Sequence, residues 1–362
     1  RTQRRRRVIL SLVALGLVAT GGALVGARPL GVWATGFFVE RSMARRLLEE
    51  LPEGLHAGLC GSGSPLADPS RAGPCVVVIA GAQVYVVDVG EGAPRKLGLM
   101  GIPAARVDGI FLTHFHSDHI GGLGELLLQR WAGGSHRAPT PVYGPQGVES
   151  VVSGFNQAYA LDRSYRVAHH GVDTMPPAGA GGAAQPFMLM AGSQESHVVL
   201  QRDGLVVTAF PVNHAPIFPA VGYRFDYRGR SVVVSGDTAP SPALGQAAKG
   251  ADLLFHEGLQ PTLVAKLRDA AVNNGKVGTA KIMADIPTYH TTPEAAARIA
   301  KDAGVRHLVF YHTIPPLLTM LLHPAFLGDA PSIFTGPITV AKDGMLFTLP
   351  GGGAKERLRE LL

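Results

Sequence analysis

The sequence predicts an α/β fold, in which short apolar strands alternate with helical segments. Three observations support this class. The 362-residue chain is 46% hydrophobic, which is enough for a sizeable buried core. Apolar runs of strand length alternate with segments of helical composition. No solenoid-type repeat or linker divides the main body. The simplest arrangement is therefore one domain built from two similar βα halves.

The chain opens with a basic cluster followed by an apolar segment. Five of the first seven residues are arginine, and residues 8–27 carry no charged side chain. A span of about 20 apolar residues matches a bilayer core, and flanking arginines favour the cytoplasmic side. Residues 1–30 are thus expected to form a transmembrane signal anchor that places the body outside the cytoplasm, in the periplasm or the extracellular space. Val25 and Ala27 also fit signal cleavage, which leaves a secreted form open.

The same arginine cluster explains most of the formal charge of +6. Without it the body is close to neutral, so composition gives no evidence of a surface that binds a phosphate backbone. Nucleic acid is therefore not the expected partner.

The remaining chain is predicted to contain an amphipathic connector at residues 31–54 and a catalytic domain at residues 55–362. Cys60 and Cys75 are far in sequence from the histidines, so a thiolate ligand or nucleophile is not expected. They end and begin successive strands, a spacing that permits a disulfide across a hairpin in an exported protein. Two free buried cysteines are the alternative.

Within the catalytic domain, strands and helices can be assigned in order from apolar runs and turn residues. Strands are expected at residues 55–60, 75–80, 83–89, 109–113, 141–143, 198–200, 205–212, 222–227 and 231–235, and helices at 95–100, 123–131 and 293–303. Arg228 and Gly229 are expected to form the turn between the last two strands. The Gly/Ala/Pro-rich residues 168–191 predict a long irregular loop.

Four potential metal ligands follow the buried strand at residues 109–113. They are His114, His116, Asp118 and His119. Imidazole and carboxylate together suit zinc, with manganese or iron less favoured, and the lack of cysteine argues against a closed structural site. One short loop cannot complete two coordination spheres. His214, Asp237 and His312 each follow a later apolar strand, and strand ends converge on one edge of a sheet.

The ordered motifs resemble the metallo-β-lactamase superfamily, specifically its RNase Z and arylsulfatase-like branch. The resemblance spans about residues 55 to 350, and its motifs read THFHSDH, VNHAP, SGDT, HEG, YHTTPEAA and YHT. It implies a four-layered αββα sandwich, which would here follow the N-terminal hydrophobic helix. Relatives often form dimers, so a homodimer is compatible with the resemblance, although nothing in the sequence marks an interface.

The resemblance also implies roles for individual residues. His114, His116 and His214 would hold one zinc ion, Asp118, His119 and His312 the second, and Asp237 would bridge the two. Asp88 would orient the ligand loop, and Asp118 could also accept a proton. His290 would protonate the leaving group with support from Glu257, and His256 matches a further active-site position. Alternatively, His290 caps the next helix, Glu257 anchors a loop, and His256 only packs.

The expected function is that of a zinc-dependent hydrolase using a metal-bridged hydroxide, because zinc lowers the pKa of bound water to about 7. The favoured substrate is a small phosphodiester or sulfate ester. An RNase Z-like endoribonuclease is the alternative. It is disfavoured because only Arg228, Gly229 and Arg230 join the strands where relatives insert a tRNA-gripping arm, and because residues 178–184 lack basic side chains. A non-catalytic, membrane-tethered metal-binding scaffold is the alternative of another class.

Overall fold

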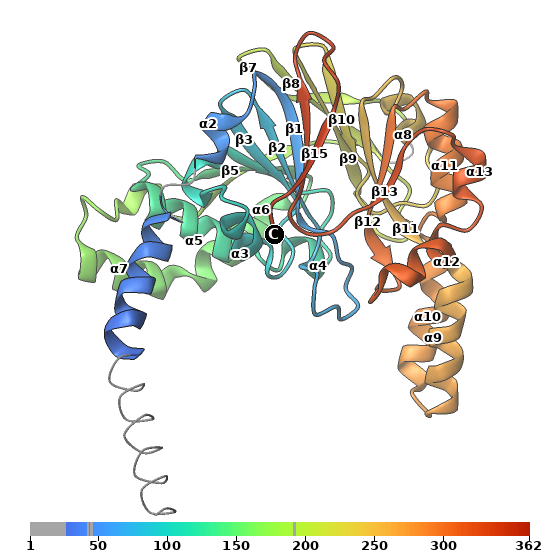
Figure 1. Cartoon of the computed structure of the whole chain (residues 1–362), viewed down its shortest axis with the longest axis horizontal. Helices are drawn as coiled ribbons and strands as arrows, with labels where there is room; N and C mark the ends of the chain where they lie inside the picture. Colours follow the sequence, from blue (N-terminus) through green and yellow to red (C-terminus); the bar gives the residue numbers. More distant parts are fainter. Residues whose placement is uncertain (1–26, 42, 44–45, 191–192) are drawn as a thin grey trace, which may run out of the picture. The chain divides into compact units, whose positions relative to one another are not determined.

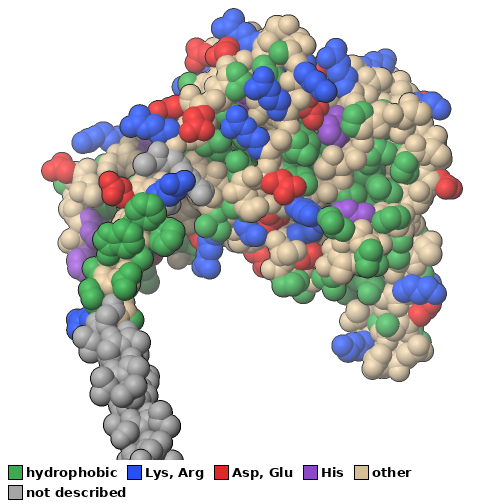
Figure 2. All heavy atoms as spheres, in the orientation of Figure 1, with side chains coloured by type: hydrophobic (Ala, Val, Ile, Leu, Met, Phe, Trp, Pro, Cys, Tyr) green, Lys and Arg blue, Asp and Glu red, His purple; other side chains and the backbone are tan. Residues whose placement is uncertain are grey.

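The computed structural model describes residues 27–41, 43, 46–190 and 193–362. The chain divides into two compact units, Arg1–Glu49 and Glu50–Leu362. In the first unit, residues 27–41 are helical, and hydrophobic side chains cover this helix (Figure 2). Trp33 is 67% exposed and its ring stacks on that of Phe37, with 5.8 Å between the centroids.

The predicted N-terminal membrane helix is not evident in the structure. Of residues 8–27, only residue 27 is described, so the predicted segment lies outside the described residues. Among the helices that the structure does describe, none is both long and apolar enough to cross a membrane. The predicted domain limits at residues 30 and 54 stay predictions.

The second unit contains two sheets (Figure 1). The first sheet has the order β15-β14-β1-β2-β3-β4-β5-β6 and the second has the order β13-β12-β11-β10-β9-β8-β7. The strands of the first sheet are β1 (Gly54–Gly61), β2 (Cys75–Ala80), β3 (Gln83–Val87), β4 (Gly109–Phe111), β5 (Thr140–Pro145), β6 (Gly182–Phe187), β14 (Met345–Pro350) and β15 (Arg357–Glu360). Those of the second are β7 (His197–Arg202), β8 (Leu205–Pro211), β9 (Val221–Tyr227), β10 (Arg230–Val234), β11 (Leu253–Leu259), β12 (His307–Ile314) and β13 (Ile338–Val340).

Helices connect these strands. The α-helices are α2 (Leu47–Glu50), α3 (Ala93–Leu99), α4 (Ser117–Ile120), α5 (Leu123–Gly134), α6 (Val148–Ala158), α7 (Ala160–His170), α8 (Pro242–Ala247), α9 (Pro261–Asn273), α10 (Val277–Asp285), α11 (Pro293–Asp302), α12 (His323–Leu327) and α13 (Ala330–Ile333). Short 3-10 turns are η1 (Ala104–Arg106), η2 (Pro177–Gly179), η3 (Ile286–Thr288) and η4 (Met320–Leu322).

The main core lies between the two sheets. β-Branched residues dominate β2, and all six of its residues are buried. Val78 of β2 and Phe111 of β4 belong to the same buried cluster as Val207 of β8 and Phe225 of β9. The rings of Phe111 and Phe225 meet edge to face, with centroids 5.5 Å apart. Alternate residues of the inward-facing strands therefore join the two sheets into one core.

A separate apolar layer covers the outer face of the second sheet. Phe210 and Val233 from the strands pack with Leu244 of α8 and with Ala296 and Ala300 of α11. Alanines on α11 allow this helix to approach the sheet closely. Two sheets with helices outside them agree with the predicted α/β class and with the predicted sandwich.

Local predictions fared unevenly. Arg228 and Gly229 form the predicted turn between β9 and β10, and both have positive φ angles, 52° and 75°. The irregular loop predicted at residues 168–191 is wrong in part, because α7 extends to His170 and β6 pairs in parallel with β5. The residues of β6 are mostly small and have low strand propensity, so the sequence gave little indication of this strand. Backbone hydrogen bonds to β5 hold it at the edge of the sheet.

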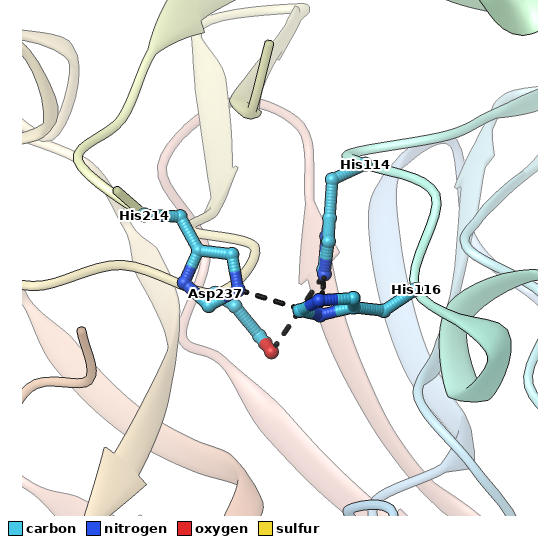
Figure 3. Close-up of side chains that lie close together, drawn as sticks. All are labelled: His114, His116, His214 and Asp237. Carbon is cyan, nitrogen blue, oxygen red and sulfur yellow. Dashed lines mark hydrogen bonds and ion pairs between the residues drawn. The ribbon is translucent and has the colours of Figure 1, made fainter. Parts of the chain in front are cut away.

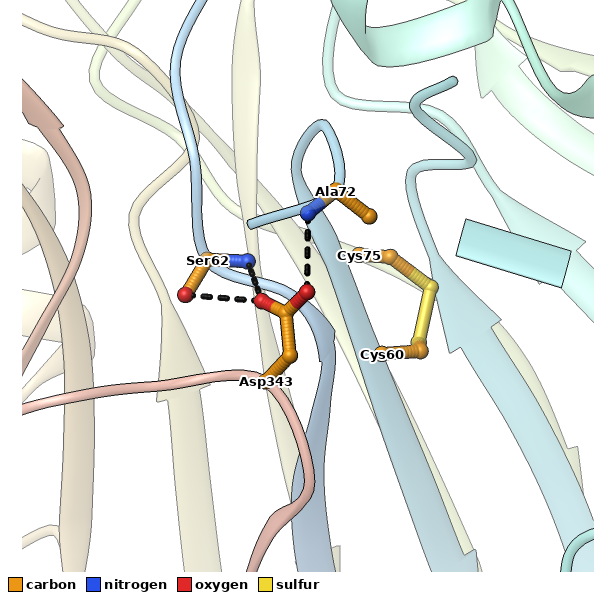
Figure 4. The surroundings of a disulfide bond; sticks show 5 residues. All are labelled: Cys60, Ser62, Ala72, Cys75 and Asp343. Atoms are coloured by element: carbon orange, nitrogen blue, oxygen red, sulfur yellow. Dashed lines mark hydrogen bonds between the residues drawn. A yellow bond between two sulfur atoms is a disulfide. The ribbon is translucent and has the colours of Figure 1, made fainter. Parts of the chain in front are cut away.

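The loop between β1 and β2 is fixed at both ends (Figure 4). Cys60 and Cys75 form a disulfide, which decides between the two alternatives for these cysteines. The Asp343 carboxylate accepts hydrogen bonds from the backbone N–H of Ser62 at 2.9 Å and from that of Ala72 at 2.8 Å. Its side chain is 3% exposed, so these bonds are shielded from water.

Candidate metal centre

Asp88 and Thr113 position the loop that carries the first predicted ligands. Asp88 follows β3, and Thr113 comes shortly after β4. The Asp88 carboxylate accepts hydrogen bonds from Thr113 N and Thr113 Oγ1, each at 2.8 Å. Asp88 Oδ2 also lies 2.8 Å from His119 Nδ1, which must donate because a carboxylate only accepts. His119 is therefore oriented with its Nε2 atom facing the other predicted ligands.

His114 and His214 are oriented in the same way. Thr113 Oγ1 lies 3.0 Å from His114 Nδ1, and because the hydroxyl donates to Asp88, its oxygen accepts from that imidazole. His214 Nδ1 lies 3.0 Å from the carbonyl oxygen of Tyr289 and donates to it. The Nε2 atoms of both imidazoles are left to face the site.

The structure brings all seven predicted ligands together. Ligand atoms of His114, His116, His214 and Asp237 lie within 4.8 Å of one another, and so do those of Asp118, His119 and His312. Figure 3 shows the first group, with His114 and His116 approaching from one side and His214 and Asp237 from the other. His114 Nε2 is 3.0 Å and His214 Nε2 3.5 Å from His116 Nδ1.

Asp237 lies between the two groups. Its Oδ2 atom is 3.3 Å from both His119 Nε2 and His312 Nε2, and 3.9 Å from His114 Nε2. Asp237 follows β10 and its side chain is 3% exposed. One carboxylate oxygen thus faces histidines of both predicted coordination spheres.

His312 reaches the site through an irregularity in β12. The register of β11 and β12 shifts between Glu257 and Gly258, so His312 is an extra residue in its strand. Its φ angle is 45°, in the left-handed region. A β-bulge redirects a side chain in this way, and such bulges are common next to functional sites. His312 Nε2 consequently lies 3.2 Å from Asp118 Oδ2.

The electrostatics of this cluster fit a bound cation. Burial lowers the pKa of His114 well below its usual value, so its imidazole is neutral and keeps a lone pair. Burial also disfavours the imidazolium of His119, yet Asp237, Asp118 and Asp88 raise its pKa well above normal. The carboxylates therefore favour positive charge at this point.

Buried polar atoms without hydrogen-bond partners supply the second test of fit. His119 Nε2 and Asp237 Oδ1 are both buried, and neither has a hydrogen-bond partner among the described residues. Unpaired buried polar atoms are costly unless something binds them. Neutral imidazoles and carboxylates are the donor set that zinc prefers. The residues present therefore fit a metal centre.

The predicted acid–base pair lies beside this cluster. His290 Nδ1 is 3.3 Å from Glu257 Oε2, and both side chains are at most 5% exposed. Burial alone would lower the pKa of His290, but Glu257 raises it above its usual value. Glu257 Oε1 also accepts from Thr291 N at 2.6 Å, and Glu257 N donates to Ser235 Oγ at 3.1 Å. His290 is thus held close to Asp237 and His312.

His256 has a different environment. Its Nδ1 donates to the carbonyl oxygen of Glu257 at 2.7 Å, and its ring is fully buried in β11. Successive strand residues face opposite sides, so Glu257 faces His290 while His256 faces away. In the part of the chain that the structure describes, His256 belongs to none of the potential metal-binding groups. This placement favours the packing alternative.

Sequence reasoning missed two positioning groups. The hydroxyl of Thr113 links His114 to Asp88. The position of Thr113 between the strand and His114 could have indicated this role from the sequence. The carbonyl of Tyr289 orients His214, but a backbone contact leaves no mark in the residue type. His169 and His170, in the segment predicted as an irregular loop, end helix α7 instead, and their ring centroids are 5.4 Å apart.

Comparisons with known proteins place this geometry in context. Residues 88–313 match the family model described as a β-lactamase superfamily domain. Ribonuclease Z of Mycobacterium avium (strain 104) is 37% identical over 262 residues, which is 72% of this chain and 86% of that protein. Two solved structures support the fold. The human tRNase Z short form has a TM-score of 0.56 at 24% identity, covering 82% of this chain and 99% of that chain. The metallo-β-lactamase fold protein YhfI from Bacillus subtilis has a TM-score of 0.56 at 19% identity, covering 81% and 98%.

These comparisons overturn the predicted substrate. A small phosphodiester or sulfate ester was favoured and nucleic acid was called unlikely, but relatives at 37% identity are named ribonuclease Z. Net charge and the absence of one basic arm pointed away from RNA. Neither quantity fixes where cationic groups lie around a site, so neither excludes RNA. The arylsulfatase-like side of the predicted branch receives no support.

The predicted localisation is corrected on the same finding. A membrane-anchored or secreted body outside the cytoplasm was expected, and the relatives at 37% identity, which are named ribonuclease Z, overturn that expectation. The membrane prediction rested on residues 8–27, of which only residue 27 is described. The part of the chain that the structure describes gives no support for the membrane as a partner.

Proposed function

Because the chain belongs to the β-lactamase superfamily, in its ribonuclease Z branch, we propose that it is a metal-dependent endoribonuclease that acts on precursor tRNA. The observation that carries this proposal is the 37% identity to a ribonuclease Z over 86% of that protein's length. The convergence of all seven predicted ligands supports it, because those motifs lie within the matched region.

Two zinc ions are the proposed cofactors. His114, His116 and His214 would hold one, Asp118, His119 and His312 the other, and Asp237 would contribute to both. The position of Asp237 Oδ2 near histidines of both groups supports the bridging role. When bound, such a pair activates water as a nucleophile and offsets charge that develops on a phosphoryl group.

The protein's own residues supply orientation and proton transfer. Asp88 and the Tyr289 carbonyl fix the tautomers of His119 and His214, so that their Nε2 atoms face the site. Glu257 Oε2 lies 3.3 Å from Nδ1 of His290 and raises the pKa of this imidazole, and Nε2 of His290 would give a proton to the departing ribose oxygen. Asp118 accepts a proton from the attacking water. Its side chain is 11% exposed, so it remains within reach of substrate.

The proposal is tested with the full chain, zinc and a precursor tRNA that carries a 3′ extension. Cleavage at one position near the start of the extension is expected, with loss of cleavage in Asp237→Ala. An exposed carboxylate, Asp173→Ala, is the matched control and should keep full activity. Zinc binding without RNA cleavage would overturn the proposal and favour a non-catalytic role.

A further inference from the structure

A cavity of about 310 Å³ lies directly beside His214. Its walls come from residues 211–218 at and after the end of β8, from residues 240–242 at the start of α8, and from Met190, Ser193 and Gln194. His214 is both a wall residue and a proposed ligand, so the cavity adjoins the metal centre at this residue. A substrate bound at the metal centre therefore lies next to this cavity.

The chemistry of the walls is neutral and partly apolar. Phe218 is 59% exposed and Met190 is 72% exposed, so large apolar surfaces are open to a ligand. Among the described wall residues, none carries a charge apart from any on His214. The side-chain amide of Asn213, which is exposed, has no hydrogen-bond partner among the described residues. Such walls suit a flat, uncharged, hydrogen-bonding group and do not suit a phosphate.

Backbone contacts fix this wall in place. Asn213 N donates to Thr238 Oγ1 at 3.1 Å, and the Asn213 carbonyl accepts from Ala239 N at 2.7 Å. Ile217 N donates to the His214 carbonyl at 2.9 Å. The side chains of Asn213 and Phe218 are therefore free to bind a ligand without a change in the loop that holds His214.

We propose that this cavity binds the nucleobase that flanks the scissile phosphate, with the base stacked on Phe218 and its edge facing the Asn213 amide. The inference rests on the proposed ribonuclease function and adds a base-binding site to it. Bases of single-stranded RNA are unstacked and are recognised by aromatic stacking and by hydrogen bonds to their edges. The cavity lies at the lower end of the range for ligand sites, about 300–1,000 Å³, as expected for one base.

The test compares Phe218→Ala with Phe218→Tyr, which keeps an aromatic ring. Leu358→Ala is the matched control, because Leu358 is a similarly exposed apolar residue, 44% exposed, on strand β15, which contributes no site residue. Substrates are a precursor tRNA with a 3′ extension and versions that lack the base on either side of the cut. KM and kcat are measured with zinc, and RNA affinity is measured by fluorescence anisotropy in EDTA.

Phe218→Ala removes one base-stacking interaction, so we expect it to weaken RNA binding about 5- to 100-fold and to raise KM accordingly, with little change in kcat. Phe218→Tyr should restore binding, and Leu358→Ala should have no effect. With one of the two abasic RNAs, wild type and Phe218→Ala should bind equally weakly. If Phe218→Ala weakens intact and both abasic RNAs by the same factor, the base site is wrong but the ribonuclease function stands. If wild type cleaves no RNA, both are overturned.

Discussion

Asp88 connects the strand end, the ligand loop and one ligand histidine through a single carboxylate. It adopts a φ angle of 57°, in the left-handed region, where asparagine and aspartate are tolerated better than most residues. All three of its hydrogen bonds are 2.8 Å long, and the residue is 1% exposed. Its backbone conformation and its side-chain contacts therefore serve the same purpose, the fixed orientation of His119.

Asp88→Asn is expected to lower zinc affinity about 10- to 100-fold, because the amide keeps only one acceptor oxygen for three donors. Competition with a chromogenic chelator measures the affinity directly. Asp173→Asn, at an exposed position, is the control and should leave the affinity unchanged. Equal zinc affinity in Asp88→Asn and wild type would show that these hydrogen bonds do not tune the site.

His290 gives a prediction about the leaving group. If it protonates a ribose oxygen, His290→Ala should reduce kcat on precursor tRNA by about 10² to 10⁴. The effect on bis(p-nitrophenyl) phosphate should be much smaller, because p-nitrophenolate departs without a proton. Steady-state rates on both substrates, with zinc content confirmed for the variant, check this. An equal loss on both substrates would instead assign His290 to the metal or to phosphate binding.

At the scale of single elements, two independent interactions hold the β1–β2 loop in place. The disulfide joins residues separated by 15 positions, and Asp343 binds both limbs of the loop from the far end of the sequence. The cross-link lowers the conformational entropy of the unfolded chain because it closes this loop, and it therefore stabilises the folded state. Strands β1 and β2 pack against the second sheet, so the disulfide and the Asp343 hydrogen bonds stabilise the core as well as the loop.

Replacing both cysteines by alanine should lower the free energy of unfolding by about 3 kcal/mol, the entropic estimate for a closed loop of this length. Urea titration of the oxidised protein, with and without the substitutions, measures the difference. Treatment with a reductant should destabilise wild type by a similar amount and leave the double variant unaffected. A double variant as stable as the oxidised protein would mean that Asp343 and packing already fix the loop.

The sequence was informative where residue type and strand pattern agree. The histidines after β4, and His214 and Asp237 after later strands, could be placed because a buried strand followed by a ligand residue restricts the geometry strongly. His312 was expected after a strand but lies within β12, at the bulge. Strand β6 could not be assigned, because backbone pairing with β5 defines it rather than its side chains. The cysteine pairing also depended on the register of β1 and β2, which no local pattern determines.

For the molecule as a whole, the sequence predicted the chemistry better than the substrate. Metal ligation is decided within a few ångströms by residues whose types are visible in the motifs. Substrate choice depends on surfaces assembled from distant segments, such as the cavity formed by residues 211–218 and 240–242. Net charge and the absence of one basic insertion do not describe the local chemistry of those surfaces. The small-ester prediction, which rested on them, was therefore wrong.

The arrangement of ligands also links metal binding to global stability. His114, His116, Asp118 and His119 follow a strand of the first sheet, whereas His214 and Asp237 follow strands of the second and His312 lies within one. Metal bound by both groups therefore joins the two sheets at one edge. Because the unfolded chain cannot present these ligands together, binding should stabilise the fold by about 2.7 kcal/mol when free zinc is 100 times the dissociation constant.

Removing metal with EDTA should therefore lower the melting temperature of wild type by several degrees, since about 1 kcal/mol shifts Tm by roughly 2–4 °C in a domain of about 150–250 residues. Differential scanning fluorimetry over a series of zinc concentrations measures this shift. In Asp237→Ala, which loses the carboxylate shared by both groups, the dependence on zinc should largely disappear. A variant that retains the full zinc-dependent shift would show that the two sheets are not joined through Asp237.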